Sequence, residues 1–311
     1  MIARYAHMRR QARVFRSLTG LTVAEFDTIA AEVLPTLQAI ERRRHERPAR
    51  QRAPGGGPLF QLDLRDQLLL TLVWLRQYPT HEALGFLFGV SDSTATRILA
   101  RVRPVLAGWG SQQLPRYDPA PQRGRPTDAL LRDLPELALI VDSFEQAVQR
   151  PQDRTEADTW YSGKKKQHTI KTQITIHRGS GLIGDISESV RGPTADLTLL
   201  KASGVADSLP EWMGLEGDLA YVGVDKVHPH GKGATPRRKP RGKERPVEDK
   251  VYNRAFAQRR IEVEHAIGQV RGFAAVSVRD RDHREHHPHR ELAIGGLVNR
   301  RKQLRWAAAA A

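Results

Sequence analysis

The 311-residue sequence contains no cysteine. Disulfide bonds, thiol nucleophiles and zinc sites built on cysteine are therefore excluded, although this absence does not fix the cellular compartment. The chain also lacks any apolar run close to the roughly 18 residues that a membrane-spanning helix needs, and its N-terminus lacks the apolar segment of a secretory signal. These absences predict a soluble, cytoplasmic protein that has no membrane partner.

Acidic residues are scarce relative to basic ones. The chain has 50 Lys and Arg against 35 Asp and Glu, which gives a formal net charge of +15. Such an excess favours a polyanionic partner, most simply nucleic acid, although basic ribosomal-type and membrane-surface proteins share the sign of the charge. The length suits two modest domains, and the 39% hydrophobic content suits folded domains joined by polar linkers.

Composition changes along the chain predict its domain boundaries. Thr22, with Glu25 three residues later, predicts a capped helix near the N-terminus. Stretches rich in Pro and Gly at 48–59 and 115–127 are typical of linkers. The predicted parts are a helical segment with its linker (1–58), an all-α domain (59–114), a second linker (115–130), an α/β domain (131–306) that contains a basic insertion (223–250), and an alanine tail (307–311).

Residues 63–106 predict three helices. The first has an apolar face from Leu68 to Leu75, the second begins at Thr80, and the third is capped by Ser91 or Ser93. A glycine-containing turn before a helix that opens with small polar residues and arginines is typical of a helix-turn-helix DNA reader, with an ordinary three-helix bundle as the alternative. The DNA-reading residues would be Ser93, Thr94, Thr96, Arg97 and Arg101.

The part from residue 137 onward alternates strands and helices. An apolar strand ends in Asp142, a half-buried strand spans 168–177, and a return strand follows at 182–189. A helix at 196–209, a short strand that ends at Asp218 and a long helix at about 253–271 complete the order. This order predicts an α/β fold in which helices cover a mixed sheet.

Two of the carboxylates in this part, Asp142 and Asp218, stand at predicted strand ends. A single aspartate in such a place is more often a turn or capping residue. Three carboxylates within about 4 Å would repel one another by several kcal/mol at an intermediate dielectric. Magnesium relieves such repulsion because it prefers oxygen ligands, and two ions can activate the attacking oxygen and stabilise the leaving one in phosphodiester chemistry.

The long helix carries two glutamates one residue apart, Glu262 and Glu264. At about 100° per residue, Arg260 and Arg271 fall within roughly 40° of Glu264, whereas Glu262 lies on the opposite flank of the apolar stripe. Only Glu264 therefore shares a flank with both arginines.

Four motifs together resemble the DDE transposases of bacterial insertion sequences, in the group related to the eukaryotic Harbinger elements. They occur in the family's order, and the helix-turn-helix at 63–106 resembles the DNA-binding domain that precedes the catalytic domain in this family. The motifs are "VDSFEQAVQRP" (141–151), "YSGKKKQHTIKTQI" (161–174), "GDLAYVG" (217–223) and "RRIEVEHAIGQVRGF" (259–273).

The resemblance implies an RNase H-like catalytic domain whose metal-binding triad is Asp142, Asp218 and Glu264, holding two Mg²⁺ (or Mn²⁺) ions. It further implies a transposase that binds the element ends, cleaves phosphodiester bonds and transfers the 3′-OH to target DNA. The implied partners are duplex DNA, as terminal inverted repeats and target, and at least one further copy of the chain, at the bacterial nucleoid. The alternatives are a domesticated nuclease of the same fold and a catalytically inactive helix-turn-helix regulator.

The chain departs from the family pattern in three places. Arg271 stands where lysine is usual, which keeps the charge but alters the geometry. Ala257 replaces a tyrosine that often stands three residues before the motif's arginine, and Ser143 and Phe144 replace a Gly–Thr pair. The missing tyrosine bears on how the substrate strand is handled, and the expected triad is unaffected.

Basic clusters supply further candidate DNA contacts. "GKKKQH" (163–168) and "RRKPRGKER" (237–245) predict phosphate contacts that carry affinity and salt dependence, with plain solvated loops as the alternative. "HREHHPHR" (283–290) is too irregular for a zinc site and more simply continues the basic surface. The candidate contacts outside the helix-turn-helix are Lys164, Lys165, Lys166, Arg237, Arg238, Lys239, Arg241, Arg260 and Arg271.

Overall fold

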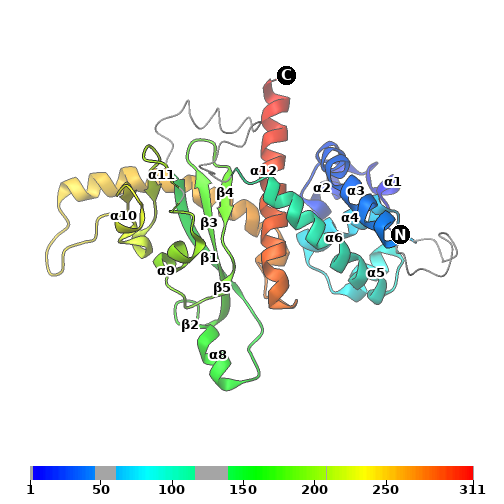
Figure 1. Cartoon of the computed structure of the whole chain (residues 1–311), viewed down its shortest axis with the longest axis horizontal. Helices are drawn as coiled ribbons and strands as arrows, with labels where there is room; N and C mark the ends of the chain where they lie inside the picture. Colours follow the sequence, from blue (N-terminus) through cyan, green and yellow to red (C-terminus); the bar gives the residue numbers. More distant parts are fainter. Residues whose placement is uncertain (1–2, 46–60, 116–138, 208, 311) are drawn as a thin grey trace. The chain divides into compact units, whose positions relative to one another are not determined.

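The computed structural model describes residues 3–45, 61–115, 139–207 and 209–310. The chain forms two compact units (Figure 1). The helical unit comprises Met1–Gln113, Gly272–Val276 and His289–Ala311, and the sheet unit comprises Leu114–Arg271 and Ser277–Pro288. The predicted linkers lie outside the described residues, apart from Pro115. No helix in the described ranges combines the length and the apolar character that crossing a membrane requires.

Helices make up the helical unit, and their predicted caps are confirmed. Thr22 and Glu25 form a capping box, in which the Thr22 amide donates to the Glu25 carboxylate (2.7 Å) and the Glu25 amide to the Thr22 hydroxyl (3.2 Å). Thr80, where the second helix of the helix-turn-helix was expected to begin, is its cap, and of the two candidates Ser91 and Ser93 it is Ser91 that caps the third. The elements are α1 (Tyr5–Met8), α2 (Ala12–Thr19), α3 (Val23–His45), α4 (Leu64–Gln77), α5 (His81–Phe88), α6 (Asp92–Gln112), η2 (Ala274–Val276) and nearly all of α12 (His287–Ala310).

The helical unit joins segments that the sequence suggested to be separate. The N-terminal helices and the helix-turn-helix belong to one unit, and α12, which the alanine run continues to Ala310, belongs to it as well. Two glycines allow α6 and α12 to cross at close range. A Cβ at Gly110 would lie 2.3 Å from the Leu292 carbonyl oxygen, and one at Gly296 would lie 2.3 Å from the Gly110 Cα. No side chain fits between the two backbones at this point.

Gly110→Ala is expected to destabilise the chain by about 1–3 kcal/mol, because the added methyl group overpacks the crossing of α6 and α12. The matched control is Gly108→Ala on the same helix, where a Cβ meets nothing within 4 Å. That control is expected to be neutral or to stabilise the helix by about 0.5–1 kcal/mol. Thermal unfolding of both variants measures the difference, and equal midpoints would contradict this account of the crossing.

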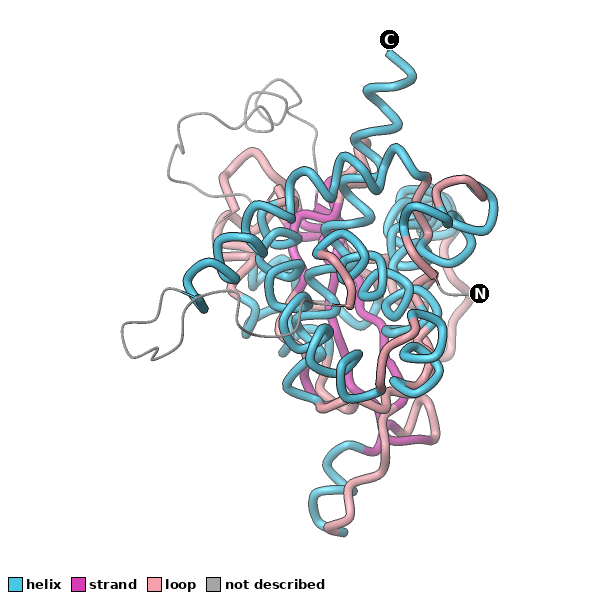
Figure 2. The backbone as a smooth tube through the Cα atoms, turned by 90° about the vertical axis from the view of Figure 1, so that its right-hand side faces the viewer, coloured by secondary structure: helices cyan, strands magenta, loops and turns pink. Residues whose placement is uncertain are grey.

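The sheet unit has a mixed sheet built around two long strands. β1 (Leu139–Ala147) pairs antiparallel with β3 (Gln167–His177), and β1 pairs parallel with β6 (Leu215–Glu216), which pairs parallel with β7 (Gly233–Ala234). The short strands β2 (Tyr161–Ser162), β4 (Ile183–Ile186) and β5 (Val190–Arg191) pair antiparallel with β3. In Figure 2 the strands form one group with helices beside it. This topology is that of an RNase H-like fold, as predicted.

Different helices cover the two faces of the sheet. The helices of this unit are α8 (Arg154–Trp160), α9 (Asp196–Ser203), η1 (Leu219–Tyr221), α10 (Val224–Val227), α11 (Val247–Arg271) and η3 (Arg284–His286). Val141 of β1 packs in a core cluster with Leu200 of α9. The next residue of β1, Asp142, points to the other face, where Arg260 of α11 reaches it. The stripe of α11 that faces the core includes Val263, Ala266 and Val270, as predicted from the helical period.

Three expectations for this unit are corrected. Asp142 does not end its strand but is the fourth of nine residues in β1, because β1 stays paired with β3 as far as Ala147. The segment 223–250 contains α10 and β7, and β7 escapes prediction because its two residues are too few for a pattern. The long helix α11 begins at Val247, six residues earlier than expected.

Candidate active site

Asp142 lies at the centre of the site, on the face of the sheet that α11 covers. Its side chain is 17% exposed, and one oxygen accepts from the Arg260 guanidinium at 2.8 Å. The other oxygen accepts from the Ser143 amide at 2.8 Å. Burial raises the pKa of the Asp142 carboxyl above its ordinary value, against the opposing influence of Arg260 and the Ser143 amide, and the charge of Asp218 adds to the rise. The fold therefore holds a carboxylate where ionisation is disfavoured.

Asp218 comes close to Asp142 because their strands are parallel neighbours. Ile140 of β1 is paired with Glu216 of β6, so each aspartate lies two residues beyond one member of the same pair. Asp218 follows the end of β6, is half-buried, and caps η1 by accepting from the Ala220 amide at 2.8 Å. A short strand and its capping turn thus place this carboxylate next to β1.

The two glutamates of α11 have different surroundings. Glu262 is half-buried and accepts from the Gly179 amide, in the turn between β3 and β4, at 2.7 Å. Glu264 is exposed and makes no ion pair within the described ranges. It lies one turn beyond Arg260, on the flank of α11 that meets Asp142.

A divalent cation fits the two aspartates by donor chemistry. Mg²⁺ and Mn²⁺ prefer carboxylate oxygens, and the repulsion between Asp142 and Asp218 favours a cation beside them. In the parts of the chain that the structure describes, however, no three His, Asp or Glu side chains are grouped as in a complete metal site. The structure thus brings Asp142 and Asp218 together and does not gather Glu264 with them.

A polar network on the opposite face of the sheet holds β1 in place, and no sequence pattern indicated it. Lys171 of β3 and Ser143 of β1 both donate to the same oxygen of Asp196, the first residue of α9, at 2.9 and 2.6 Å. The buried Tyr221 hydroxyl donates to Gln173 at 3.3 Å. Burial raises the pKa of Tyr221 far above its ordinary value, and the charges of Asp196, Asp142 and Asp218 add to the rise. These contacts fix the residue that follows Asp142.

A second ion pair joins α11 to the sheet. Arg259 donates to the buried Glu216 at 3.1 Å, and the next residue, Arg260, donates to Asp142. Adjacent arginines of α11 therefore contact adjacent parallel strands. Glu216 lies within "GLEGDLAY", two residues before the expected triad member Asp218. Its role as the partner of Arg259 could have been predicted only from the pairing between β1 and β6.

The remaining basic candidates lie on several elements. Lys164, Lys165 and Lys166 are exposed in the turn between β2 and β3. Arg237 pairs with Asp249 at 3.0 Å, and Arg238 donates to the Leu219 carbonyl at 3.5 Å beside η1. Three further residues are exposed, and their side chains make no hydrogen bond or ion pair in the described ranges: Lys239, Arg241 and Arg271.

The helix-turn-helix candidates separate into exposed and internally bonded residues. Ser93 and Arg97 are exposed near the start of α6. Thr96 is also exposed, and its hydroxyl contacts His81 of α5 at 2.8 Å. The Thr94 hydroxyl accepts from Ser91 at 2.9 Å. Arg101 differs from expectation, because it is half-buried, hydrogen-bonds to Gln67 of α4 and lies 3.6 Å from Glu41 of α3. Its charge stabilises the packing of α6 within the unit.

Gly217→Ala is expected to reduce any activity that depends on Asp218 by about a hundredfold, the loss that roughly 1 Å of misplacement produces. A Cβ at Gly217 would lie 2.6 Å from the Cβ of the buried Tyr221, so the turn that carries Asp218 has to move. DNA cleavage and the thermal midpoint measure the effect, with Gly108→Ala as the control. Normal cleavage by Gly217→Ala would show that the position of Asp218 does not matter.

Comparison with known proteins places the chain in a family. Over 93% of its length it is 28% identical to "Probable transposase for insertion sequence element IS702" of Microchaete diplosiphon, of which it covers 94%. Over 80% of its length it is 24% identical to "Putative transposase for insertion sequence element IS112" of Streptomyces albus G, of which it covers 83%. A solved structure described as "Crystal structure of a pre-cleavage Mos1 transpososome" matches 99% of this chain and 98% of its own, at 10% identity. Its TM-score of 0.21 is too low to support an argument.

Two family matches divide the chain between them. Residues 60–111 match the helix-turn-helix of DDE superfamily endonuclease, and residues 141–299 match the DDE superfamily endonuclease itself. The latter match covers more than half of the chain and contains Asp142, Asp218 and Glu264. The chain therefore belongs to the DDE superfamily endonuclease family.

Proposed function

We propose that the chain is a DNA transposase of an insertion sequence, which binds the element ends, cleaves phosphodiester bonds and transfers the freed 3′-OH to target DNA. The observation that carries the proposal is the pair of aspartates, one on β1 and one just beyond the end of its parallel neighbour β6, with a guanidinium of α11 bonded to Asp142. Family membership and relatives named as transposases over nearly the whole chain support it.

In this proposal Asp142, Asp218 and Glu264 hold two Mg²⁺ or Mn²⁺ ions. When bound, such ions activate the attacking oxygen and stabilise the leaving oxygen. The chain's own residues position the strands and the DNA. Ser143, Lys171 and Asp196 fix β1 behind Asp142. Arg260 bears the charge needed to hold a phosphate beside that aspartate.

DNA binding is assigned to two sets of residues. The start of α6, with Ser93, Thr94, Thr96 and Arg97, would read base edges in the major groove. Phosphate contacts, which carry affinity without sequence choice, would come from Lys164, Lys165, Lys166, Arg237, Arg238, Lys239, Arg241, Arg260 and Arg271. Arg101 would act indirectly, by holding α6 on α3 and α4. Since transposition joins two ends, at least two copies of the chain would assemble on DNA.

A strand-transfer assay tests the proposal. The full chain is incubated with duplex DNA that carries the sequence flanking its gene, a supercoiled target plasmid, and either Mg²⁺ or EDTA. Metal-dependent joining of the flanking DNA to the plasmid is the expected result. Cleavage without joined products would support a nuclease of the same fold, and DNA binding without cleavage would support a regulator. Either result would overturn the transposase assignment.

A further inference from the structure

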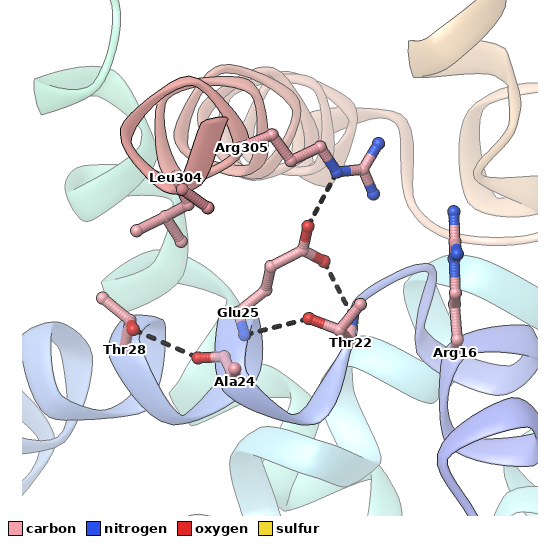
Figure 3. Close-up of a pocket in the computed structure, with 8 residues that line it drawn as sticks. Arg16, Thr22, Ala24, Glu25, Thr28, Leu304 and Arg305 are labelled. Atoms are coloured by element: carbon pink, nitrogen blue, oxygen red, sulfur yellow. Dashed lines mark hydrogen bonds and ion pairs between the residues drawn. The ribbon is translucent and has the colours of Figure 1, made fainter. Parts of the chain in front are cut away.

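A pocket of about 370 Å³ lies within the helical unit, between the start of α3 and the end of α12 (Figure 3). This volume falls in the range of about 300–1,000 Å³ that is usual for ligand pockets. The helix-turn-helix belongs to the same unit. Apolar groups form most of its surface, and its charged groups are two arginines and one glutamate. The lining residues are Arg16, Thr22, Ala24, Glu25, Thr28, Leu304, Arg305 and Ala308.

The single carboxylate of the lining is already engaged. Glu25 has a side chain only 8% exposed, and one of its oxygens accepts from the Arg305 Nε at 2.8 Å. Its other oxygen accepts from the Thr22 amide at 2.7 Å. The capping box thus engages the amides of Thr22 and Glu25, and the charged donors of the lining are the arginine side chains.

Two arginines, Arg16 and Arg305, line the pocket with this carboxylate, and the charge of Glu25 also acts on Arg301. Arg16 is exposed, lines the pocket and makes no hydrogen bond or ion pair through its side chain within the described residues, and Arg305 keeps its two terminal nitrogens beyond the bond to Glu25 (Figure 3). Arg301 donates to the Gly20 carbonyl oxygen at 3.2 Å. Burial lowers the pKa of Arg301, and the like charges of Arg305, Arg76 and Arg16 lower it further against the pull of Glu25. The pocket therefore holds an excess of positive charge.

An oxyanion matches this arrangement. Guanidinium groups bind phosphate through paired, charge-assisted hydrogen bonds, and a phosphate would relieve the repulsion among the arginines. A phosphate could come from solution or from a DNA backbone. The net charge of +15 and the helix-turn-helix in the same unit favour the DNA backbone.

We propose that the pocket bounded by Arg16 and Arg305 binds a backbone phosphate of duplex DNA, as a contact separate from the start of α6. This inference rests on the proposed function only in requiring that the chain binds DNA. The pocket would add affinity and orientation but no sequence choice, because phosphates are the same at every base pair.

The test compares Arg16→Glu with Arg13→Glu in the full chain. Both residues are exposed on α2 and both changes alter the net charge equally, but only Arg16 lines the pocket. Arg16→Glu is expected to weaken duplex binding severalfold and to reduce the slope of log affinity against log salt by about one, the value for one lost phosphate contact. Arg13→Glu is expected to change neither by more than a minor amount. Arg16→Lys, which keeps the charge and loses the planar fork, is expected to fall between the parent and Arg16→Glu.

Three outcomes would overturn the inference. Equal losses for Arg16→Glu and Arg13→Glu would show a general field effect, and no loss for either would show that DNA does not reach the pocket. In the third, millimolar inorganic phosphate at constant ionic strength raises the thermal midpoint of the parent but not of Arg16→Glu, while DNA affinity is unchanged. This would assign the pocket to free phosphate.

Cleavage at saturating DNA separates this inference from the catalytic proposal. If the Arg16→Glu variant cleaves DNA normally and its affinity for DNA is unchanged, only the proposed phosphate contact in the pocket is refuted. Failure of the parent to cleave under the same conditions would refute the catalytic part of the proposed function, and the binding comparison would still decide the pocket.

Discussion

Glu264→Gln is expected to reduce metal-dependent DNA cleavage by about a thousandfold or more, on the order of the loss when one charge-stabilising group is removed from an active site. Glu262→Gln is expected to leave most of the activity. The reason lies in the flanks of α11. Arg260, one turn before Glu264, reaches Asp142 at 2.8 Å, whereas Glu262 faces away from it and bonds to the Gly179 amide. Glutamine keeps the size of each side chain and removes only its charge.

The Glu262 variant is the matched control for this experiment. Its glutamine can still accept from the Gly179 amide and loses only the contribution of the charge to this exposed bond, about 1 kcal/mol of stability or less, so the thermal midpoint is measured beside the rate. Glu264 has no such bond in the described ranges, and its variant should keep the parent's midpoint. Equal losses of cleavage in the two variants would contradict the assignment of Glu264.

Asp142→Asn is expected to abolish cleavage to a similar extent and to raise the thermal midpoint at neutral pH, or at least not to lower it. Because burial raises the pKa of Asp142, the folded state binds its proton more tightly than the unfolded state does. Stability then falls as pH rises from the ordinary aspartate pKa of about 4 to the raised value, and the cost persists at neutral pH. Asparagine removes this cost.

The gain from Asp142→Asn should shrink as the pH is lowered toward about 4, since the parent's aspartate becomes protonated there. Thermal unfolding across this pH range measures the effect without DNA. A midpoint that falls sharply at neutral pH would show that the ion pair with Arg260 outweighs burial, and that Asp142 is a structural residue.

Local chemistry allowed much of the fold to be predicted. The caps at Thr22, Thr80 and Ser91 are side-chain bonds to amides three residues away, so a short window of sequence contains them. The apolar stripe of α11 is periodic over many residues and was predicted for the same reason. The position of β3 was predicted too, but the strand is buried on both faces from Thr169 to His177 and not half-buried as expected.

Features that depend on distant partners could not be predicted. β7 consists of Gly233 and Ala234, and it is a strand only because β6 lies beside it. The sequence predicts an exposed Arg101 on α6, but its side chain is half-buried because it contacts Glu41 and Gln67 on other helices. The crossing at Gly110 involves a helix almost two hundred residues away, and a lone glycine in a helix does not reveal its neighbour.

The candidate site shows the same division. The motifs selected Asp142 and Asp218, and the parallel pairing of β1 with β6 explains why they lie together. Lys171 and Asp196 were missed because their role depends on β1, β3 and α9 meeting at Ser143. A contact among three elements that are distant in the chain cannot be predicted from a short window of sequence.

The central claim is that Asp142, Asp218 and Glu264 together hold divalent metal, and iron-directed backbone cleavage tests it most directly. Iron(II) replaces magnesium among the oxygen ligands of the full chain, and ascorbate with peroxide then cuts the backbone next to the bound ion. The account predicts cuts near residues 142, 218 and 264, suppressed by excess Mg²⁺ and lost in Asp142→Asn. Cuts confined to other segments, or cuts at 142 and 218 with none on α11 even when DNA is bound, would contradict it.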